Sequence, residues 1–156
     1  MQRRALKQPR FERGVAMVEF AIALPLLLLM LFAIGEFGRM LFQYNSLLQA
    51  NRDAVRYVAG KAWNRTLGRV ELSAALQTET KNLAVYGVPT AQPGSQPLVS
   101  GLTTADVQVS AVGVDHVQVN ISYRFRPLFG SGIPAFIGGQ TALDFPLVAT
   151  TVMRAL

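Results

Sequence analysis

The longest hydrophobic stretch of the chain runs from Val15 to Ile34 and contains one charged residue, Glu19. Twenty helical residues reach about 30 Å, which matches the hydrocarbon thickness of a bilayer. A cleaved secretory signal has a shorter apolar core of about 7–15 residues and a small-x-small cleavage site after it. Here the stretch ends in Ile34-Gly35-Glu36-Phe37 without such a site. The pattern therefore predicts a retained transmembrane helix.

After this span the apolar positions are confined to one side of a continuing helix. They recur at the i, i+3, i+4, i+7 spacing of an amphipathic helix and comprise Phe37, Met40, Leu41, Tyr44, Leu47, Leu48, Asn51, Val55 and Val58. Gly60 is expected to end the helix. The spacing predicts one helix over 15–60, with its second half packing as the spine of a head over 61–156. Pro25 removes a backbone donor from the span and is expected to kink it.

Two weaker patterns follow the long helix. Apolar residues from about Arg69 to Leu83 lie roughly on one helical face and predict a second, shorter helix. The segment Pro89–Gly101 carries three prolines, and its composition predicts an extended loop.

The C-terminal part of the chain changes to a period of two, which is typical of half-buried strands. Apolar residues alternate with polar ones on both sides of a turn near Gly113-Val114-Asp115; they are Val107, Val109 and Ala111 before it and Val117, Val119, Ile121, Tyr123 and Phe125 after it. A loop over Pro127–Gln140 and a third strand over about Ala142–Arg154 complete the prediction. The expected fold class is α+β, with a small antiparallel sheet of about three strands.

The positive charge is concentrated at the N-terminus. The formal net charge is +6, and residues 1–14 hold five basic residues against Glu12, a net +4, which leaves +2 for the remainder. Only Arg39 follows the span within fifteen residues. Basic residues next to a span stay in the cytoplasm, so we expect a cytoplasmic leader and a translocated head. No basic face or motif for nucleic acid accompanies this charge, and no nucleic-acid partner is expected.

Catalytic, metal and cofactor sites are not expected. The chain has no cysteine, and its one histidine, His116, has no second imidazole with which to hold a metal. Asp106, Asp115 and Asp144 are not paired by their spacing. The segment 130–135 matches the G-x-G-x-x-A dinucleotide pattern, but no sustained helix or acidic residue follows at the required distance.

Glu19 is the residue that most needs an explanation, because a carboxylate inside a membrane span is costly and functional by default. It follows a basic leader, Gly14 and four apolar residues, and it precedes Phe20. This arrangement resembles the class III signal of the type IV pilin superfamily, in which a membrane-embedded prepilin peptidase cuts after the glycine. The resemblance implies cleavage between Gly14 and Val15, where glycine is expected to let the chain stay extended. It also implies that Glu19 and Phe20 act in processing and subunit docking, with Glu19 pairing with the α-amino group of a neighbouring subunit.

Further motifs narrow the resemblance to TadE/TadF-like pseudopilins of tight-adherence pilus systems. They are Val18-Glu19-Phe20-Ala21, Leu24-Pro25-Leu26-Leu27, Phe37-Gly38-Arg39 and Ala54-Val55-Arg56-Tyr57. The resemblance implies a minor pilin-like subunit in the bacterial inner membrane, with its head in the periplasm. The implied partners are the prepilin peptidase, other pilin or pseudopilin subunits, inner-membrane assembly proteins and the lipid bilayer.

Two other classes of protein stay open from the residues alone. One is a single-pass, signal-anchored envelope protein whose exported head binds a ligand or a partner. The other, less favoured, is an anchored enzyme. Only the pilin-like interpretation requires both Gly14 and Glu19.

Overall fold

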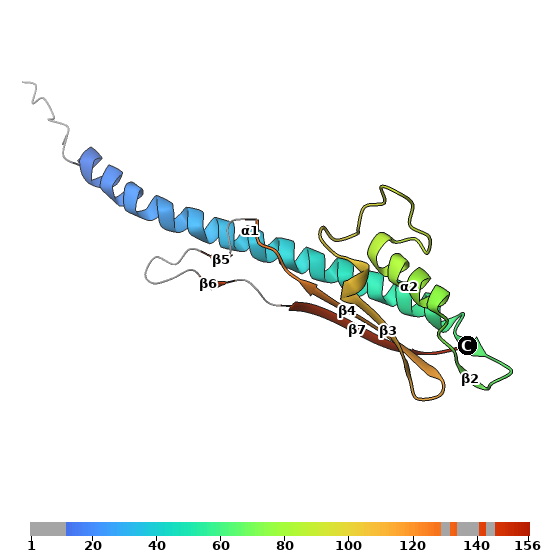
Figure 1. Cartoon of the computed structure of the whole chain (residues 1–156). Coiled ribbons are helices and arrows are strands. Elements are labelled where there is room, and N and C mark those ends of the chain that lie inside the picture. Colours follow the sequence, from blue (N-terminus) through green and yellow to red (C-terminus); the bar gives the residue numbers. More distant parts are fainter. Residues whose placement is uncertain (1–11, 129–131, 134–140, 143–145) are drawn as a thin grey trace, which may run out of the picture. The chain divides into compact units, whose positions relative to one another are not determined.

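The computed structural model of the chain describes residues 12–128, 132–133, 141–142 and 146–156. The chain divides into two compact units, Met1–Phe37 and Gly38–Leu156. The first unit contributes the N-terminal part of helix α1, which spans Glu12–Ala59 (Figure 1). The second unit contains the rest of α1, a second helix and the strands.

In the first unit, α1 continues without interruption through Pro25 and leaves its hydrophobic side chains exposed. Among the described residues, α1 is the one helix long enough and apolar enough to cross a membrane. The helix begins at Glu12, three residues before the predicted start at Val15, so Gly14 is part of it. The basic leader over 1–14 lies largely outside the described residues.

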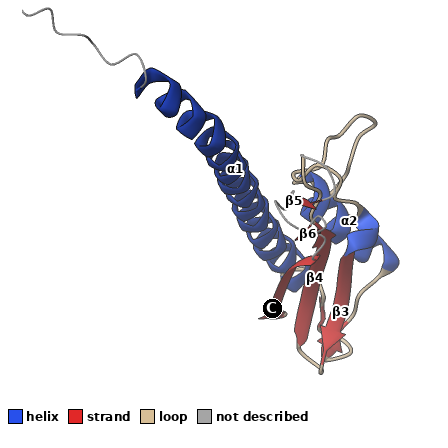
Figure 2. Cartoon of the chain, turned by 90° about the vertical axis from the view of Figure 1, so that its left-hand side faces the viewer, coloured by secondary structure: helices blue, strands red, loops and turns tan. Residues whose placement is uncertain are grey.

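The second unit is built around a three-stranded antiparallel sheet with the strand order β3-β4-β7. These strands are β3 (Val107–Val112), β4 (His116–Arg124) and β7 (Pro146–Arg154). Val119 at the middle of β4 faces Val109 on β3 and Thr151 on β7. The turn between β3 and β4 contains Gly113 at φ +65°, a conformation that glycine adopts without strain. The hairpin and the third strand confirm the predicted α+β fold (Figure 2).

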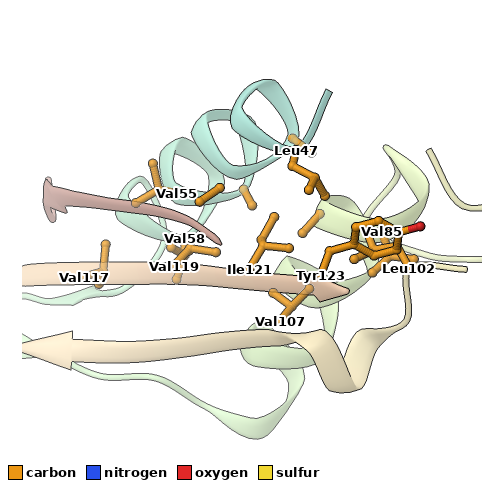
Figure 3. Packing of buried hydrophobic residues seen from close by; sticks show 14 of the residues in the cluster. Leu47, Val55, Val58, Val85, Leu102, Val107, Val117, Val119, Ile121 and Tyr123 are labelled. Carbon is orange, nitrogen blue, oxygen red and sulfur yellow. The ribbon is translucent and has the colours of Figure 1, made fainter. Parts of the chain in front are cut away.

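The core lies between the second half of α1 and the inner face of the sheet. Alternate residues of β4 point into it, and Figure 3 shows Val55 and Val58 of α1 packed above Val119. The positions on α1 with 0% exposure are Leu47, Asn51, Ala54, Val55 and Val58. The prediction that one side of this helix packs against the head is therefore confirmed for the C-terminal part of the helix. Phe37 and Leu41 at its start are exposed instead, by 58% and 43%.

Helix α2 spans Ala74–Tyr86, so its predicted start near Arg69 is wrong. Arg69–Val70 form the short strand β2, which pairs with β1, Trp63–Asn64. The helix starts where it does because the Ser73 side chain accepts a hydrogen bond from the amide of Leu76 and so caps the first turn.

Segments predicted as loops also contribute to the fold. Within Pro89–Gly101, the amide of Leu98 donates to the carbonyl of Val85 at 2.7 Å, and Val99 is buried. The predicted loop over Pro127–Gln140 lies mostly outside the described residues, but it holds Gly132–Ile133 (β5), which pairs with Thr141–Ala142 (β6). The last strand begins at Pro146 rather than near Ala142, and residues 143–145 between them are outside the described part.

Candidate functional site

The predicted processing segment lies on the first turns of α1. Gly14, Val15, Glu19 and Phe20 are all helical and exposed, Val15 by 68% and Phe20 by 61%. Residues four apart share one side of a helix, so Glu19 lies one turn beyond Val15, about 6 Å along the axis. Gly14, Val15, Val18, Glu19 and Ile22 line a shallow hollow there. The structure thus brings these residues to one side of the helix.

The peptide bond between Gly14 and Val15 belongs to the first turn of the helix rather than to an extended segment, in contrast to the expectation for Gly14. The first four amides of a helix have no partner inside the helix, and glycine in a helix costs about 1 kcal/mol relative to alanine. Apart from its chain neighbours and the backbone of its own helix, no atom of the described residues lies within 4 Å of a Cβ placed at Gly14. This turn can therefore unwind into an extended conformation at little cost.

Glu19 lies in an apolar setting. Val18 and Phe20 beside it and Ile22 one turn on are each exposed by more than 60%, so the surrounding helix surface requires an apolar environment. When this surface inserts into a bilayer, the Glu19 carboxylate inserts with it. A nearby positive charge offsets the free-energy cost of burying the carboxylate. The position is therefore suited to bind a cation at the edge of the hydrocarbon.

A polar hollow that the sequence did not reveal lies beside the C-terminal end of α1. Its walls include Lys61, Trp63 and Glu79, and the Tyr57 hydroxyl donates to Glu79 Oε2 at 2.6 Å. Lys61 Nζ donates to the Tyr57 oxygen and lies 4.2 Å from the centre of its ring. The bond from Tyr57 lowers the pKa of Glu79, and Lys61 lowers it further. Tyr57 comes from the end of α1, Lys61 and Trp63 follow that helix, and Glu79 comes from α2. Because Glu79 is about twenty positions from Tyr57 and Lys61 in the sequence, no local pattern could have marked the group.

A second polar cluster joins the hairpin turn to the C-terminal strand. Asp115 Oδ1 lies 2.7 Å from His116 Nδ1, and Asp115 Oδ2 lies 3.1 Å from Arg154 Nε. The bond from His116 lowers the pKa of Asp115. His116 is the first residue of β4 and thus has a structural role beside the hairpin turn. Within the described part of the chain, no three His, Cys, Asp or Glu side chains gather as metal ligands.

Comparison with known proteins finds a family match in the N-terminal part of the chain. Residues 14–56 match the family model described as TadE-like protein. No curated protein and no solved structure matches the chain. The match starts at Gly14, the predicted cleavage residue, and covers most of α1. It confirms the TadE-like resemblance that was drawn from the motifs of this segment.

Proposed function

We propose that this chain, whose residues 14–56 are TadE-like, is a minor pilin-like subunit that acts in assembly of a tight-adherence pilus. A prepilin peptidase hydrolyses the bond between Gly14 and Val15, and the remaining chain stays anchored by its apolar helix. The head over 61–156 then lies in the periplasm.

The observation that carries the proposal is the position of Glu19 relative to Gly14. The family match begins at the glycine, and the carboxylate lies five residues later on an otherwise apolar helix surface. A helix that serves only as a membrane anchor does not need a carboxylate at this depth, since an apolar residue there has a lower free energy of insertion into the membrane. A filament subunit uses it to bind the α-amino group of a neighbour.

Hydrolysis creates the group that Glu19 needs. Water adds across the bond, leaving a carboxylate on Gly14 and an ammonium group on Val15. An ammonium group at a helix N-terminus faces the positive end of the helix dipole, which is unfavourable. A carboxylate from an adjacent subunit offsets this charge, and each group lowers the cost of burying the other. The processed N-terminus therefore favours docking to another subunit.

The test is the mass of the mature N-terminus. In membranes that contain an active prepilin peptidase, the chain should begin at Val15, and the same chain in membranes without the peptidase should keep Met1. Gly14→Asp should block the cut, because a charged side chain must be desolvated in the peptidase site and restricts the backbone. A full-length wild-type chain in the presence of active peptidase would refute the proposal and favour a signal-anchored envelope protein.

A further inference from the structure

The polar hollow beside the end of α1 has the size of a ligand site. Its volume is about 580 Å³, within the range of small-molecule sites in proteins, and it is open to solvent. Its walls come from the residues just after α1, the β1–β2 hairpin and the first turns of α2. All of them belong to the Gly38–Leu156 unit. Cleavage at Gly14 and anchoring by the apolar helix make no use of this hollow.

Hydrogen bonds hold the polar side chains of the hollow in fixed positions. The Asn64 side chain accepts from two amides of the turn that follows it and donates to Glu71 Oε2 at 2.5 Å. The amide of Glu71 donates to the carbonyl of Ala62 at 2.8 Å, which ties the hairpin to the chain after α1. On α2, Glu79 Oε2 accepts from the Tyr57 hydroxyl at 2.6 Å. A site that is ordered in advance loses little conformational entropy when a ligand binds.

The same side chains keep hydrogen-bonding groups available for a ligand. The bonds to Glu71 and Glu79 use Oε2, and within the described part of the chain neither Oε1 accepts a hydrogen bond. The guanidinium of Arg65, which is exposed, and the indole N–H of Trp63, which is half-buried, have no partner among the described residues. The hollow therefore offers both donors and acceptors.

The charges and the aromatic ring of the hollow indicate the class of ligand. Lys61 and Arg65 carry its positive charges. Glu71 and Glu79 carry its negative charges, so the lining has no net charge at neutral pH. An excess of one sign would favour a ligand of the opposite charge, and this hollow has no such excess. A sugar fits instead, because its hydroxyls both donate and accept, and the C–H groups on one face of its ring suit the negative face of an indole.

We propose that this hollow binds a sugar unit of a carbohydrate chain. The Trp63 ring packs against the C–H face of the sugar. The carboxylates of Glu71 and Glu79 accept hydrogen bonds from the sugar hydroxyls, and Arg65 donates to them. Because the hollow is open, the carbohydrate chain can continue beyond the bound unit. Sugar binding here requires neither cleavage at Gly14 nor assembly of a pilus.

The one tryptophan of the chain reports binding directly. Its fluorescence in the full-length protein, kept in a detergent without sugar headgroups, should change in a saturable way when a sugar covers the Trp63 ring. The probes are N,N′-diacetylchitobiose and cellobiose, which share one linkage and differ only in the acetamido groups that replace two hydroxyls. Binding of the first indicates a glycan of N-acetylated sugars, and binding of the second a polysaccharide of neutral hexoses. Either result supports the proposal.

Two other solutes test the two parts of the recognition separately. Sorbitol has hydroxyls but no ring to pack against the indole, so it should give no saturable change. Dialanine is a zwitterion without net charge and should give none either. Because the bound sugar is uncharged, its affinity should also change little as salt is added.

A matched pair of substitutions tests the place of binding. Arg65→Ala should weaken disaccharide binding about tenfold, as expected for the loss of one hydrogen bond from a charged donor. The control is Arg69→Ala, because Arg69 is also exposed in the β1–β2 hairpin but does not line the hollow. This control should leave the affinity unchanged. Neither guanidinium has a partner among the described residues, so both variants should fold, and their Trp63 melting curves check this.

The results that overturn the proposal are distinct from failure of the proposed function. No saturable response to either disaccharide overturns it, and so does a response to sorbitol or dialanine of equal affinity. Equal affinities of Arg65→Ala and Arg69→Ala for the disaccharide also overturn it, because binding would then lie elsewhere. The mass of the mature N-terminus tests the proposed function independently of these titrations.

Discussion

The buried amide of Asn51 gives the sharpest test of how the head is stabilised. Its side chain is fully buried on α1, in the stripe that otherwise holds Leu47, Val55 and Val58. Neither Oδ1 nor Nδ2 has a hydrogen-bond partner among the described residues. A polar group buried in this way loses its bonds to water without replacement. We therefore predict that Asn51→Leu stabilises the head.

The size of the effect follows from the lost bonds. An unsatisfied buried donor or acceptor costs about 1–3 kcal/mol, and leucine fills a similar volume without this cost. Allowing for imperfect packing of the new side chain, we expect a gain of about 2 kcal/mol. The head unit contains the 119 residues from Gly38 to Leu156. For a unit of this size, the gain corresponds to a rise in Tm of about 8 °C.

The assay can follow the head selectively. The chain has one tryptophan, Trp63, which lies in β1 of the head unit, so its fluorescence during heating in detergent reports on the head rather than the span. The matched control is Thr80→Val. Thr80 is also fully buried, but its hydroxyl donates to the Leu76 carbonyl at 2.7 Å, so the change should alter stability by about 1 kcal/mol or less.

An unchanged or lower Tm for Asn51→Leu would refute the reasoning. It would mean that the amide is satisfied in the folded protein, for example by an ordered water, and that leucine removes these bonds. Asn51→Asp further tests whether the buried side chain at this position has hydrogen-bond partners. A buried carboxylate without a partner should lower the stability by several kcal/mol at neutral pH.

Three further predictions concern the anchor and the head. Glu19→Ala should leave cleavage after Gly14 intact but reduce piliation, because losing one partner of a buried ion pair costs about 3–5 kcal/mol; normal piliation would make Glu19 a tolerated boundary carboxylate. A reporter fused after Leu156 should be active only if it functions in the periplasm, and activity of a cytoplasmic reporter would reverse the assigned topology. The lowered pKa of Glu79 favours its charged form in the folded head, so its contribution is present at neutral pH and is lost as the pH falls through that pKa. Glu79→Gln should therefore weaken the acid dependence of the Trp63 melting curve, and an identical dependence in both proteins would contradict the assigned bond from Tyr57.

Much of the candidate processing site could be predicted from local sequence. Gly14, Val15, Glu19 and Phe20 are recognisable because the motif is contiguous and adjoins a long apolar stretch. The family match over 14–56 covers these residues. The structure added that the peptide bond between Gly14 and Val15, where we propose the cut, lies within a helical turn, which a motif does not specify because flanking residues decide where a helix begins.

The sequence by itself also determined the α+β class, the long helix and the β3–β4 hairpin. Each of these elements has a regular spacing of apolar residues along the sequence, and this spacing differs between helices and strands. The elements can therefore be predicted from local sequence. The start of α2 was predicted less well. The region from Arg69 to Leu83 has a weak helical pattern throughout, and pairing of β2 with β1 and the Ser73 cap decided where the helix begins.

Only the tertiary structure brought residues from distant parts of the chain together. Val99, in a segment with the composition of a loop, is buried in the same core as Val85 of α2. Arg39 contacts Phe125 and the carbonyl of Arg126, 87 positions away in the sequence. Such contacts depend on how all the side chains of the core pack together. The periodicity of apolar residues along the chain does not show which distant residues will meet.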